Sequence, residues 1–220
     1  MKFIKLQKNT QKEKGFTLVE TLVAISILLL SIIGPMEIAA RGLFSAYYAR
    51  DEIAAYYLAQ EGVEYVRNLR DTMYLEDFKA GTVNSPAESL NGKWVEHPSL
   101  SVCFSPAGSP DACTIDVLTG AITACKENPG EGACLDVTRL LKYNSETNEY
   151  SYRSVTGRNQ PTKFWRTIKI TQYPNQQAKQ EALVTSKVEW NTGSLLGTKR
   201  EFKIQERLIN DDEALLTSNK

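Results

Sequence analysis

The sequence predicts an α+β protein in which a long N-terminal helix packs on an antiparallel β-sheet head. Three observations lead to this prediction. Residues 16–40 form one apolar run, helical periodicity continues from it to about residue 71, and the remainder alternates strand-like runs with turn residues. A helix followed by consecutive antiparallel strands buries one stripe of the helix against one face of the sheet.

Residues 16–40 read FTLVETLVAISILLLSIIGPMEIAA and carry no charge from Thr21 to Met36. This run approaches the ~20 apolar residues that cross a bilayer as a helix. A secretory signal peptide is disfavoured, because the small residues after the run continue into a helical pattern instead of forming a cleavage site. Glu20 near the start of the run indicates a function, because a carboxylate at bilayer depth costs about 2–3 kcal/mol.

Positive charge is concentrated ahead of the apolar run. The 220-residue chain has 26 basic and 26 acidic residues, and residues 1–15 hold five of the lysines and one of the acids. The chain without this segment keeps 21 basic and 25 acidic residues, a formal net charge of −4. The asymmetry predicts a leader that stays in the cytoplasm and a following part that is exported. The overall balance argues against nucleic acid as a general partner.

The stretch K-G-F-T-L-V-E, from Lys14 to Glu20, resembles the class III signal of type IV prepilins and type II secretion pseudopilins. The resemblance implies that a prepilin peptidase cuts between Gly15 and Phe16 and that Phe16 is then N-methylated. Glycine fits this role because it brings no side chain into the cleft of the peptidase. The resemblance also implies that Glu20 meets the amino terminus of a neighbouring subunit, which offsets the cost of its burial and fixes the register of the helix.

The same resemblance implies four parts: a cytoplasmic leader at 1–15, a transmembrane or fibre-core half-helix at 16–40, an amphipathic half-helix at 41–71, and an extracytoplasmic β-rich head at 72–220. The implied partners are other pilin subunits, the prepilin peptidase/methyltransferase, the pilus assembly platform protein, and the membrane before assembly. The expected location is the inner or cytoplasmic membrane, crossed once with the N-terminus in the cytoplasm, and then a pilus or pseudopilus. No cofactor is implied.

Helical spacing predicts that the helix continues for ~80 Å from Phe16 to about Leu69, at 1.5 Å per residue. An apolar stripe is predicted at Leu43, Tyr47, Ala54, Leu58, Gly62, Tyr65 and Leu69, and a wetter face at Arg50, Asp51, Glu52, Gln60, Glu61, Glu64 and Arg67. A kink or local melting is expected at Gly34 and Pro35, because proline cannot donate a backbone hydrogen bond to Ser31.

Strand-like runs separated by turn signals follow the helix. They are 94–104, 114–118, 121–124, 149–154, 164–172, 182–190 and 200–208. The last three runs also resemble the closing strands of minor pilin-like proteins, although less specifically than the leader does.

The chain has four cysteines within 32 residues, Cys103, Cys113, Cys125 and Cys134, and none has the C-x-x-C spacing of a zinc or redox motif. In an exported chain such a cluster predicts disulfides, with buried free thiols as the alternative. Pairs 103–113 and 125–134 are favoured because each closes a short loop containing Pro or Gly. A bridge between Cys113 and Cys125 across a hairpin at Thr119-Gly120 is the main rival.

The sequence offers little support for catalysis or metal binding. His97 is the one histidine and lies beside Pro98, with no G-x-S-x-G motif and no phosphate loop in the chain. Asp111, Asp116 and Asp136 lack calcium-loop spacing, and a solvated acidic surface is the preferred interpretation. Tyr47, Tyr48, Tyr56 and Tyr57 are expected to pack the helix against the sheet or against neighbouring helices. We therefore predict that the protein is not an enzyme and holds no metal.

Three hypotheses follow. The preferred one is a minor pilin or pseudopilin that joins a fibre through its helix. The second makes the head a binding module, an adhesin or a DNA-uptake pilin with a basic patch at Arg153, Arg158, Lys163 and Arg166. The third is a membrane protein with one span and an enzymatic ectodomain, which predicts that residues 1–15 are retained. One sequence leaves open whether the subunit is major or minor and whether it serves a pilus or type II secretion.

Overall fold

Helix α1 runs from Leu18 to Lys79 and therefore continues past Asp71, the end predicted from the sequence. The computed structural model describes residues 15–81, 98–105, 109–152, 159–172, 181–192 and 198–209. The leader residues 1–14 and His97 lie outside these ranges. The chain divides into two units, residues 1–48 and 49–220. The first contains the apolar half of α1, and the second contains the rest of α1 and all of the β structure.

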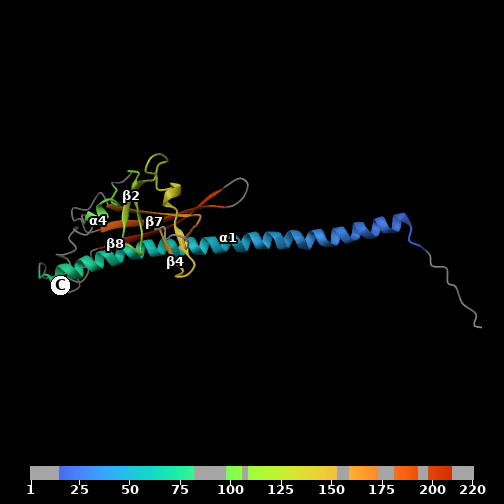
Figure 1. Cartoon of the computed structure of the whole chain (residues 1–220), viewed down its shortest axis with the longest axis horizontal. Helices are drawn as coiled ribbons and strands as arrows, with labels where there is room; N and C mark the ends of the chain where they lie inside the picture. Colours follow the sequence, from blue (N-terminus) through green and yellow to red (C-terminus); the bar gives the residue numbers. More distant parts are fainter. Residues whose placement is uncertain are drawn as a thin grey trace, which may run out of the picture. The chain divides into compact units, whose positions relative to one another are not determined.

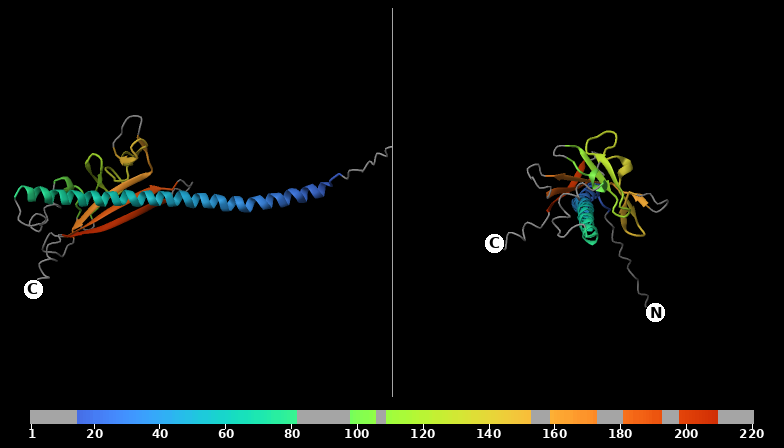
Figure 2. Two further views of the ribbon diagram at one scale, coloured as in Figure 1. Left: turned by 90° about the horizontal axis from the view of Figure 1, so that it is seen from below. Right: turned by 90° about the vertical axis from the view of Figure 1, so that its left-hand side faces the viewer.

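The second unit is built on a five-stranded antiparallel sheet with the strand order β2-β1-β6-β7-β8 (Figures 1 and 2). Its strands are β1 (Asp111–Ile115), β2 (Ile122–Lys126), β6 (Phe164–Gln172), β7 (Glu181–Asn191) and β8 (Lys199–Ile209). Gly120 lies in the β1–β2 turn with φ of +70°, so the hairpin predicted at Thr119-Gly120 is confirmed. The last three strands lie within one residue of their predicted bounds.

A smaller antiparallel sheet has the order β4-β3-β5, with strands β3 (Lys142–Asn144), β4 (Glu149–Ser151) and β5 (Asn159–Pro161). Two short helices complete the described elements, α4 (Pro98–Ser101) and the 3-10 helix η1 (Val137–Arg139). The strand predicted over 94–104 is wrong over Pro98–Ser101. Proline suits a first helical turn, because its φ is already helical and it has no N–H to satisfy.

Alternation along β6 and β7 sets which side chains face the helix. Ile168 and Ile170 of β6 and Val184 of β7 pack with Val63 and Val66 of α1 in one core cluster. A second cluster joins helix residues to the other ends of the same strands, with members Ala55, Leu58, Ala59, Leu141, Phe164, Val188 and Trp190. The C-terminal part of α1 thus lies along one face of the large sheet, as Figure 2 shows.

Gly62 allows this close approach of helix and sheet. A Cβ atom at this position would lie 2.7 Å from Ser186 Oγ, 3.0 Å from Ile168 Cδ1 and 3.2 Å from Arg166 Cδ. These separations are shorter than ordinary van der Waals contacts. Any other residue at position 62 would therefore force the Ser186 and Ile168 side chains to shift, whereas glycine lets α1 pack at this distance from β6 and β7.

Arg166 is a buried cation that joins three elements. Its side chain is fully buried, forms an ion pair with Glu61 of α1, and donates hydrogen bonds to the carbonyl oxygens of Leu58 (3.1 Å) and Ile115 (2.8 Å). Two further ion pairs, Asp51–Lys163 and Arg67–Glu206, also join α1 to the large sheet and its flanking loop. Asp51 is buried, so its predicted place on the wetter face of the helix is wrong.

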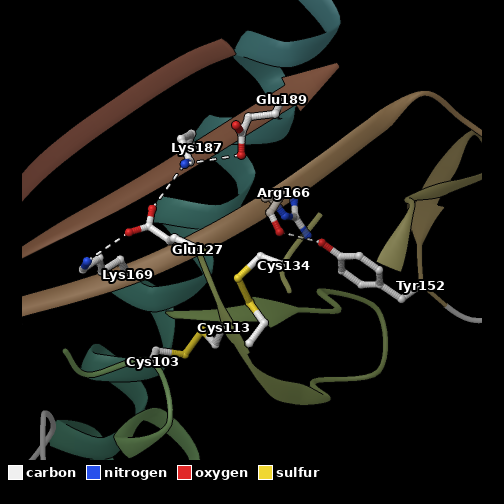
Figure 3. The surroundings of a disulfide bond; sticks show 10 residues. Cys103, Cys113, Glu127, Cys134, Tyr152, Arg166, Lys169, Lys187 and Glu189 are labelled. Atoms are coloured by element: carbon white, nitrogen blue, oxygen red, sulfur yellow. Dashed lines mark hydrogen bonds and ion pairs between the residues drawn. A yellow bond between two sulfur atoms is a disulfide. The ribbon is translucent and has the colours of Figure 1, made fainter. Parts of the chain in front are cut away.

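The structure joins Cys103 to Cys113 and Cys125 to Cys134, the pairs favoured from the sequence (Figure 3). The rival bridge is excluded by the register of the β1–β2 hairpin. Cys113 lies opposite Ala124, and Cys125 lies opposite Ala112, so the two cysteines point to opposite faces of the hairpin. The first bridge lies in the main core, and the second forms a small cluster with Ala112.

A chain of ion pairs covers part of the sheet face opposite the helix. Glu127, from the loop that the second bridge closes, accepts from Lys169 at 3.0 Å and from Lys187 at 3.2 Å, and Lys187 also reaches Glu189 (Figure 3). Burial by itself raises the pKa of Glu127, but the hydrogen bonds and charges of the two lysines outweigh it and hold this pKa below its ordinary value. Glu127 thus fastens the disulfide-closed loop to the sheet.

Replacing Gly62 with valine is expected to lower the free energy of unfolding of the head by about 1–3 kcal/mol, the usual cost of overpacking a core. The measurement is urea unfolding of the full chain in detergent, followed by tryptophan fluorescence. Gly42→Val is the matched control, because a Cβ at Gly42 has nothing within 4 Å. Equal effects of the two substitutions would contradict the role given to Gly62.

The Glu127 carboxylate is expected to stabilise the head only above acidic pH. Because its pKa is lowered on folding, the stabilisation is complete above the unfolded value near 4.5 and is lost as the pH falls through the lower folded value. The stability difference between wild type and Glu127→Gln should therefore shrink from neutral pH to about pH 3. Unfolding curves across this range test it, with Glu131→Gln as the control for loss of an acid from the same loop. A difference that grows in acid would contradict the assignment.

Candidate functional site: the processing and assembly segment

The segment predicted to be cut lies just ahead of α1. Gly15, Phe16 and Thr17 are exposed and precede the helix, and nothing lies within 4 Å of a Cβ built on Gly15. Phe16 is 79% exposed. The peptide bond predicted to be cut is therefore outside regular secondary structure and open to an incoming enzyme.

Thr17 caps the first turn of α1. Its carbonyl accepts the backbone N–H of Thr21 at 3.2 Å, and its hydroxyl accepts the backbone N–H of Glu20 at 3.3 Å. The sequence Thr17-Leu18-Val19-Glu20 has the spacing of a helix-capping box. This spacing is a local sequence signal that is sufficient to predict the cap.

Glu20 lies in the first turn of α1, and its residue is exposed. The partial positive charge of a helix N-terminus favours a carboxylate at this position by about 0.3–1 kcal/mol. The Thr17 hydroxyl accepts the Glu20 backbone N–H, and the Glu20 carboxylate belongs to an exposed residue. It is available to a cation from outside the chain.

The helix after Glu20 exposes apolar side chains on every side. An 18-residue window of α1 has a mean hydropathy of 2.2 and no buried residue, so by length and composition this helix can cross a membrane. Its exposed large apolar residues include Leu18, Val19, Leu22, Val23, Ile25, Ile27, Leu28, Leu29, Leu30, Ile32, Ile33, Met36 and Ile38. The hydroxyls of Thr21, Ser26 and Ser31 donate to carbonyls one turn back, which satisfies them within the helix.

Gly34 and Pro35 both lie within α1, which has helical structure on either side of them. A Cβ on Gly34 would meet nothing within 4 Å. The kink or melting expected at these two residues stays a prediction for the assembled state.

The three acids considered for calcium take separate structural roles. Asp116 is buried and accepts from the Ser151 hydroxyl at 2.7 Å and from the backbone N–H of Leu118 at 3.1 Å. Asp136 caps η1 through Thr138, and Asp111 pairs with the Ser109 hydroxyl. Asp116 is therefore not part of a solvated acidic surface. No group of three His, Cys, Asp or Glu side chains placed to hold a metal exists among the residues that the structure describes.

The basic patch proposed for DNA is not assembled by the described residues. Arg166 is fully buried and so is not a surface cation, and Lys163, whose side chain is 40% exposed, is paired with Asp51. Arg153 and Arg158 lie outside the described ranges. Buried Arg166 is instead part of the framework of the head, where its backbone carbonyl also accepts the Tyr152 hydroxyl at 3.0 Å (Figure 3). Burial raises the pKa of this tyrosine, so it stays neutral and continues to donate.

The predicted helix stripe is correct in part. Leu58 and Gly62 are buried and Ala54, Tyr65 and Leu69 are half-buried, all in the second unit. Leu43 and Tyr47 are exposed in the first unit. Tyr56 and Tyr57 are 43% and 64% exposed, and Tyr56 touches the sheet through its edge contact with Phe202, as expected of these aromatic residues.

The comparisons with known proteins point to the N-terminal segment. Residues 10–34 match the family model of the prokaryotic N-terminal methylation motif. This match contains Gly15, Phe16, Glu20 and the apolar start of α1. No curated protein and no solved structure matches the chain.

The motif supports a type IV pilin or pseudopilin subunit, a family of structural proteins that are generally not enzymes. It implies processing by a prepilin peptidase and assembly with other pilins, and with the exposed apolar helix it indicates membrane anchoring followed by incorporation into a pilus. The chain thus carries the prepilin signal of type IV pilins, ahead of a long helix and an antiparallel head with the α+β architecture of a type IV pilin-like protein.

Proposed function

We propose that the protein is a minor pilin-like subunit of a type IV pilus or pseudopilus, assembled through α1 after removal of residues 1–15. The observation that carries the proposal is one continuous arrangement at the N-terminus. An exposed Gly15-Phe16 bond is followed by a capped first turn with Glu20 and then by an apolar helix that its own unit leaves uncovered. Such a helix is stable only in lipid or against other apolar helices.

The proposed processing has two steps. A prepilin peptidase hydrolyses the peptide bond between Gly15 and Phe16 with water, and the new amine of Phe16 then takes a methyl group from a methyl donor, which leaves demethylated as one proton is released. The exposure of this segment ahead of α1 supports the first step, because a peptidase needs the scissile backbone outside a helix. The five lysines of the leader hold it on the cytoplasmic side while the head is exported.

Assembly then rests on the Glu20 carboxylate. The freed N-terminal amine of a neighbouring pilin subunit is the cation that this carboxylate meets, with the platform protein bringing the subunits together in the inner or cytoplasmic membrane. A charge-assisted hydrogen bond of this kind contributes about 1.5–3 kcal/mol. It also sets the axial register of one helix against the next, because each helix has one such acid near its start.

The head favours a minor component. It carries two disulfide-closed segments and an additional three-stranded sheet beside the large sheet. Bulk of this kind limits lateral packing between heads along a fibre. We therefore infer a low-abundance subunit that modifies the tip or surface of the fibre, in a pilus or in a secretion pseudopilus.

Gly15→Leu is expected to block processing, because a leucine side chain would occupy the narrow cleft that holds the glycine. Mass spectrometry of the chain from the cell envelope should show residues 1–15 still attached in this variant and absent in the wild type. Gly42→Leu is the control, since Gly42 is likewise free of neighbours within 4 Å. A wild-type chain that retains Met1 would overturn the proposal and favour a plain membrane anchor.

Glu20→Gln is expected to leave membrane insertion and processing intact and to reduce incorporation into fibres about tenfold to a hundredfold, from the loss of one charge-assisted hydrogen bond. The amount of subunit in sheared fibres, relative to the membrane fraction, measures this. Glu37→Gln is the matched control, because Glu37 is an exposed acid of the same helix that pairs with Arg41 at 2.6 Å. Equal incorporation of both variants would rule out the assembly role of Glu20.

A further inference from the structure

An open cleft lies on the face of the large sheet opposite α1. Side chains of β6, β7 and β8 line it, at strand positions that alternate with those facing the helix, and Glu127 of the disulfide-closed loop borders it. The cleft has a volume of about 470 Å³, within the range of ~300–1,000 Å³ that is usual for small-molecule sites. Apart from Leu183, every side chain that lines it is charged or carries a hydroxyl or an amide.

The cleft carries one excess positive charge. Three lysines, Lys169, Lys187 and Lys203, and two glutamates, Glu127 and Glu201, line it, which leaves a formal charge of +1. Glu127 uses one carboxylate oxygen for Lys169 and the other for Lys187 (Figure 3). Both oxygens of this acid are therefore taken, and it has no contact left for the third lysine.

Lys203 is the cation that stays unmatched. It lies directly opposite Lys187 in the register of β7 and β8, and like charges in such a cross-strand pair destabilise a sheet. Lys203 is exposed and forms no ion pair with any residue that the structure describes. An anion bound at Lys203 would offset the repulsion between the two ammonium groups and would accept charge-assisted hydrogen bonds.

The neutral groups of the cleft suit a ligand that is rich in hydroxyls. Thr171 and Thr185 supply hydroxyls and Gln205 an amide, groups that both donate and accept hydrogen bonds. The Gln205 amide nitrogen donates to the Thr185 hydroxyl at 3.1 Å, which holds both side chains in place without using the amide oxygen. Glu201 is exposed and adds a further acceptor. An acidic peptide would need apolar anchor pockets, and Leu183 is the one apolar side chain in this lining.

We propose that this cleft binds an acidic sugar, a ring that carries several hydroxyls and one carboxylate. The carboxylate binds at Lys203, where it matches the single excess positive charge, and the hydroxyls bond to the two threonines and Gln205. The two lysines that Glu127 fixes are in place before a ligand arrives, which lowers the entropy cost of binding. The site belongs to the head alone, so it goes beyond the proposed function and does not depend on how α1 assembles.

Binding to the full chain in detergent, followed by ligand-observed NMR, tests the proposal. Sialyllactose and methyl galacturonoside each have one carboxylate, and they should bind about tenfold more tightly than their neutral counterparts lactose and methyl galactoside. A short peptide with blocked ends and one glutamate is the third probe and should bind no better than the neutral sugars. Equal binding of the peptide and the acidic sugars, or of the acidic and neutral sugars, overturns the proposal.

Substitutions in the full chain place the site. Lys203→Gln should lower the affinity for the acidic sugars about tenfold and leave the urea unfolding of the head unchanged. Lys126→Gln is the matched control and should change neither, because Lys126 is an exposed lysine of β2, at the other edge of the sheet.

Thr171→Val separates the hydroxyl contacts from the charge. It should weaken acidic and neutral sugars alike, about threefold to tenfold, from the loss of one neutral hydrogen bond. Acidic sugars that bind Lys203→Gln as tightly as the wild type overturn the assignment of this cleft. Each of these outcomes leaves the proposed function standing, whereas a wild-type chain that is neither processed nor found in fibres overturns that function and not the sugar site.

Discussion

The rest of this structure depends on one constraint, which is that the first half of α1 carries apolar side chains that no other described residue of its own unit covers. Burying a leucine, isoleucine or valine side chain contributes about 1.5–3 kcal/mol, so a helix with more than a dozen exposed ones must be covered elsewhere. Lipid meets this need first, and other helices of the same kind meet it in an assembly. Because the hydroxyls of Thr21, Ser26 and Ser31 are satisfied within the helix, neither environment has to supply hydrogen bonds to them.

The second half of α1, in contrast, buries its apolar side chains against the sheet of the head. Gly62 lets the helix approach β6 and β7 closely. Arg166 forms an ion pair with Glu61 and donates hydrogen bonds to the backbone carbonyls of Leu58 in α1 and Ile115 in β1. A buried cation of this kind is costly if either partner is lost, about 3–5 kcal/mol, so the contact is specific as well as stabilising. The two disulfides, Cys103–Cys113 and Cys125–Cys134, hold the loop segments next to β1 and β2. The head is thus built to retain one helix, and the exposed part of that helix is left for other partners.

Sequence reasoning predicted the parts of this fold whose signals are local and long. Strands β6, β7 and β8 have nine to eleven residues of clear alternation and were predicted within one residue, whereas β3 and β5 have three residues each and give no periodicity to detect. The errors at Asp51 and Arg166 share a cause. A charged residue at a given helix or strand position predicts solvent exposure, and only the fold reveals that Lys163 and Glu61 are placed to pair with them. The Thr17 cap was local and was overlooked, but the contact of Tyr56 with Phe202 spans most of the chain and has no local signal.

The energetics of Glu20 explain why the processing segment and the apolar helix belong together. A carboxylate in hydrocarbon costs about 2–3 kcal/mol on insertion scales. The partial positive charge of the helix N-terminus stabilises it by only about 0.3–1 kcal/mol. The Thr17 hydroxyl satisfies the Glu20 N–H and leaves the carboxylate itself unchanged. A cation at the same depth would offset the remaining cost, and the described apolar stretch from Leu18 to Met36 contains no basic side chain. A cut at Gly15 would create such a cation, since it frees an amine at the start of every helix. Proteolysis would then do more than remove a leader, because it would supply the charge that makes the acid tolerable in an assembly of apolar helices that are processed in the same way.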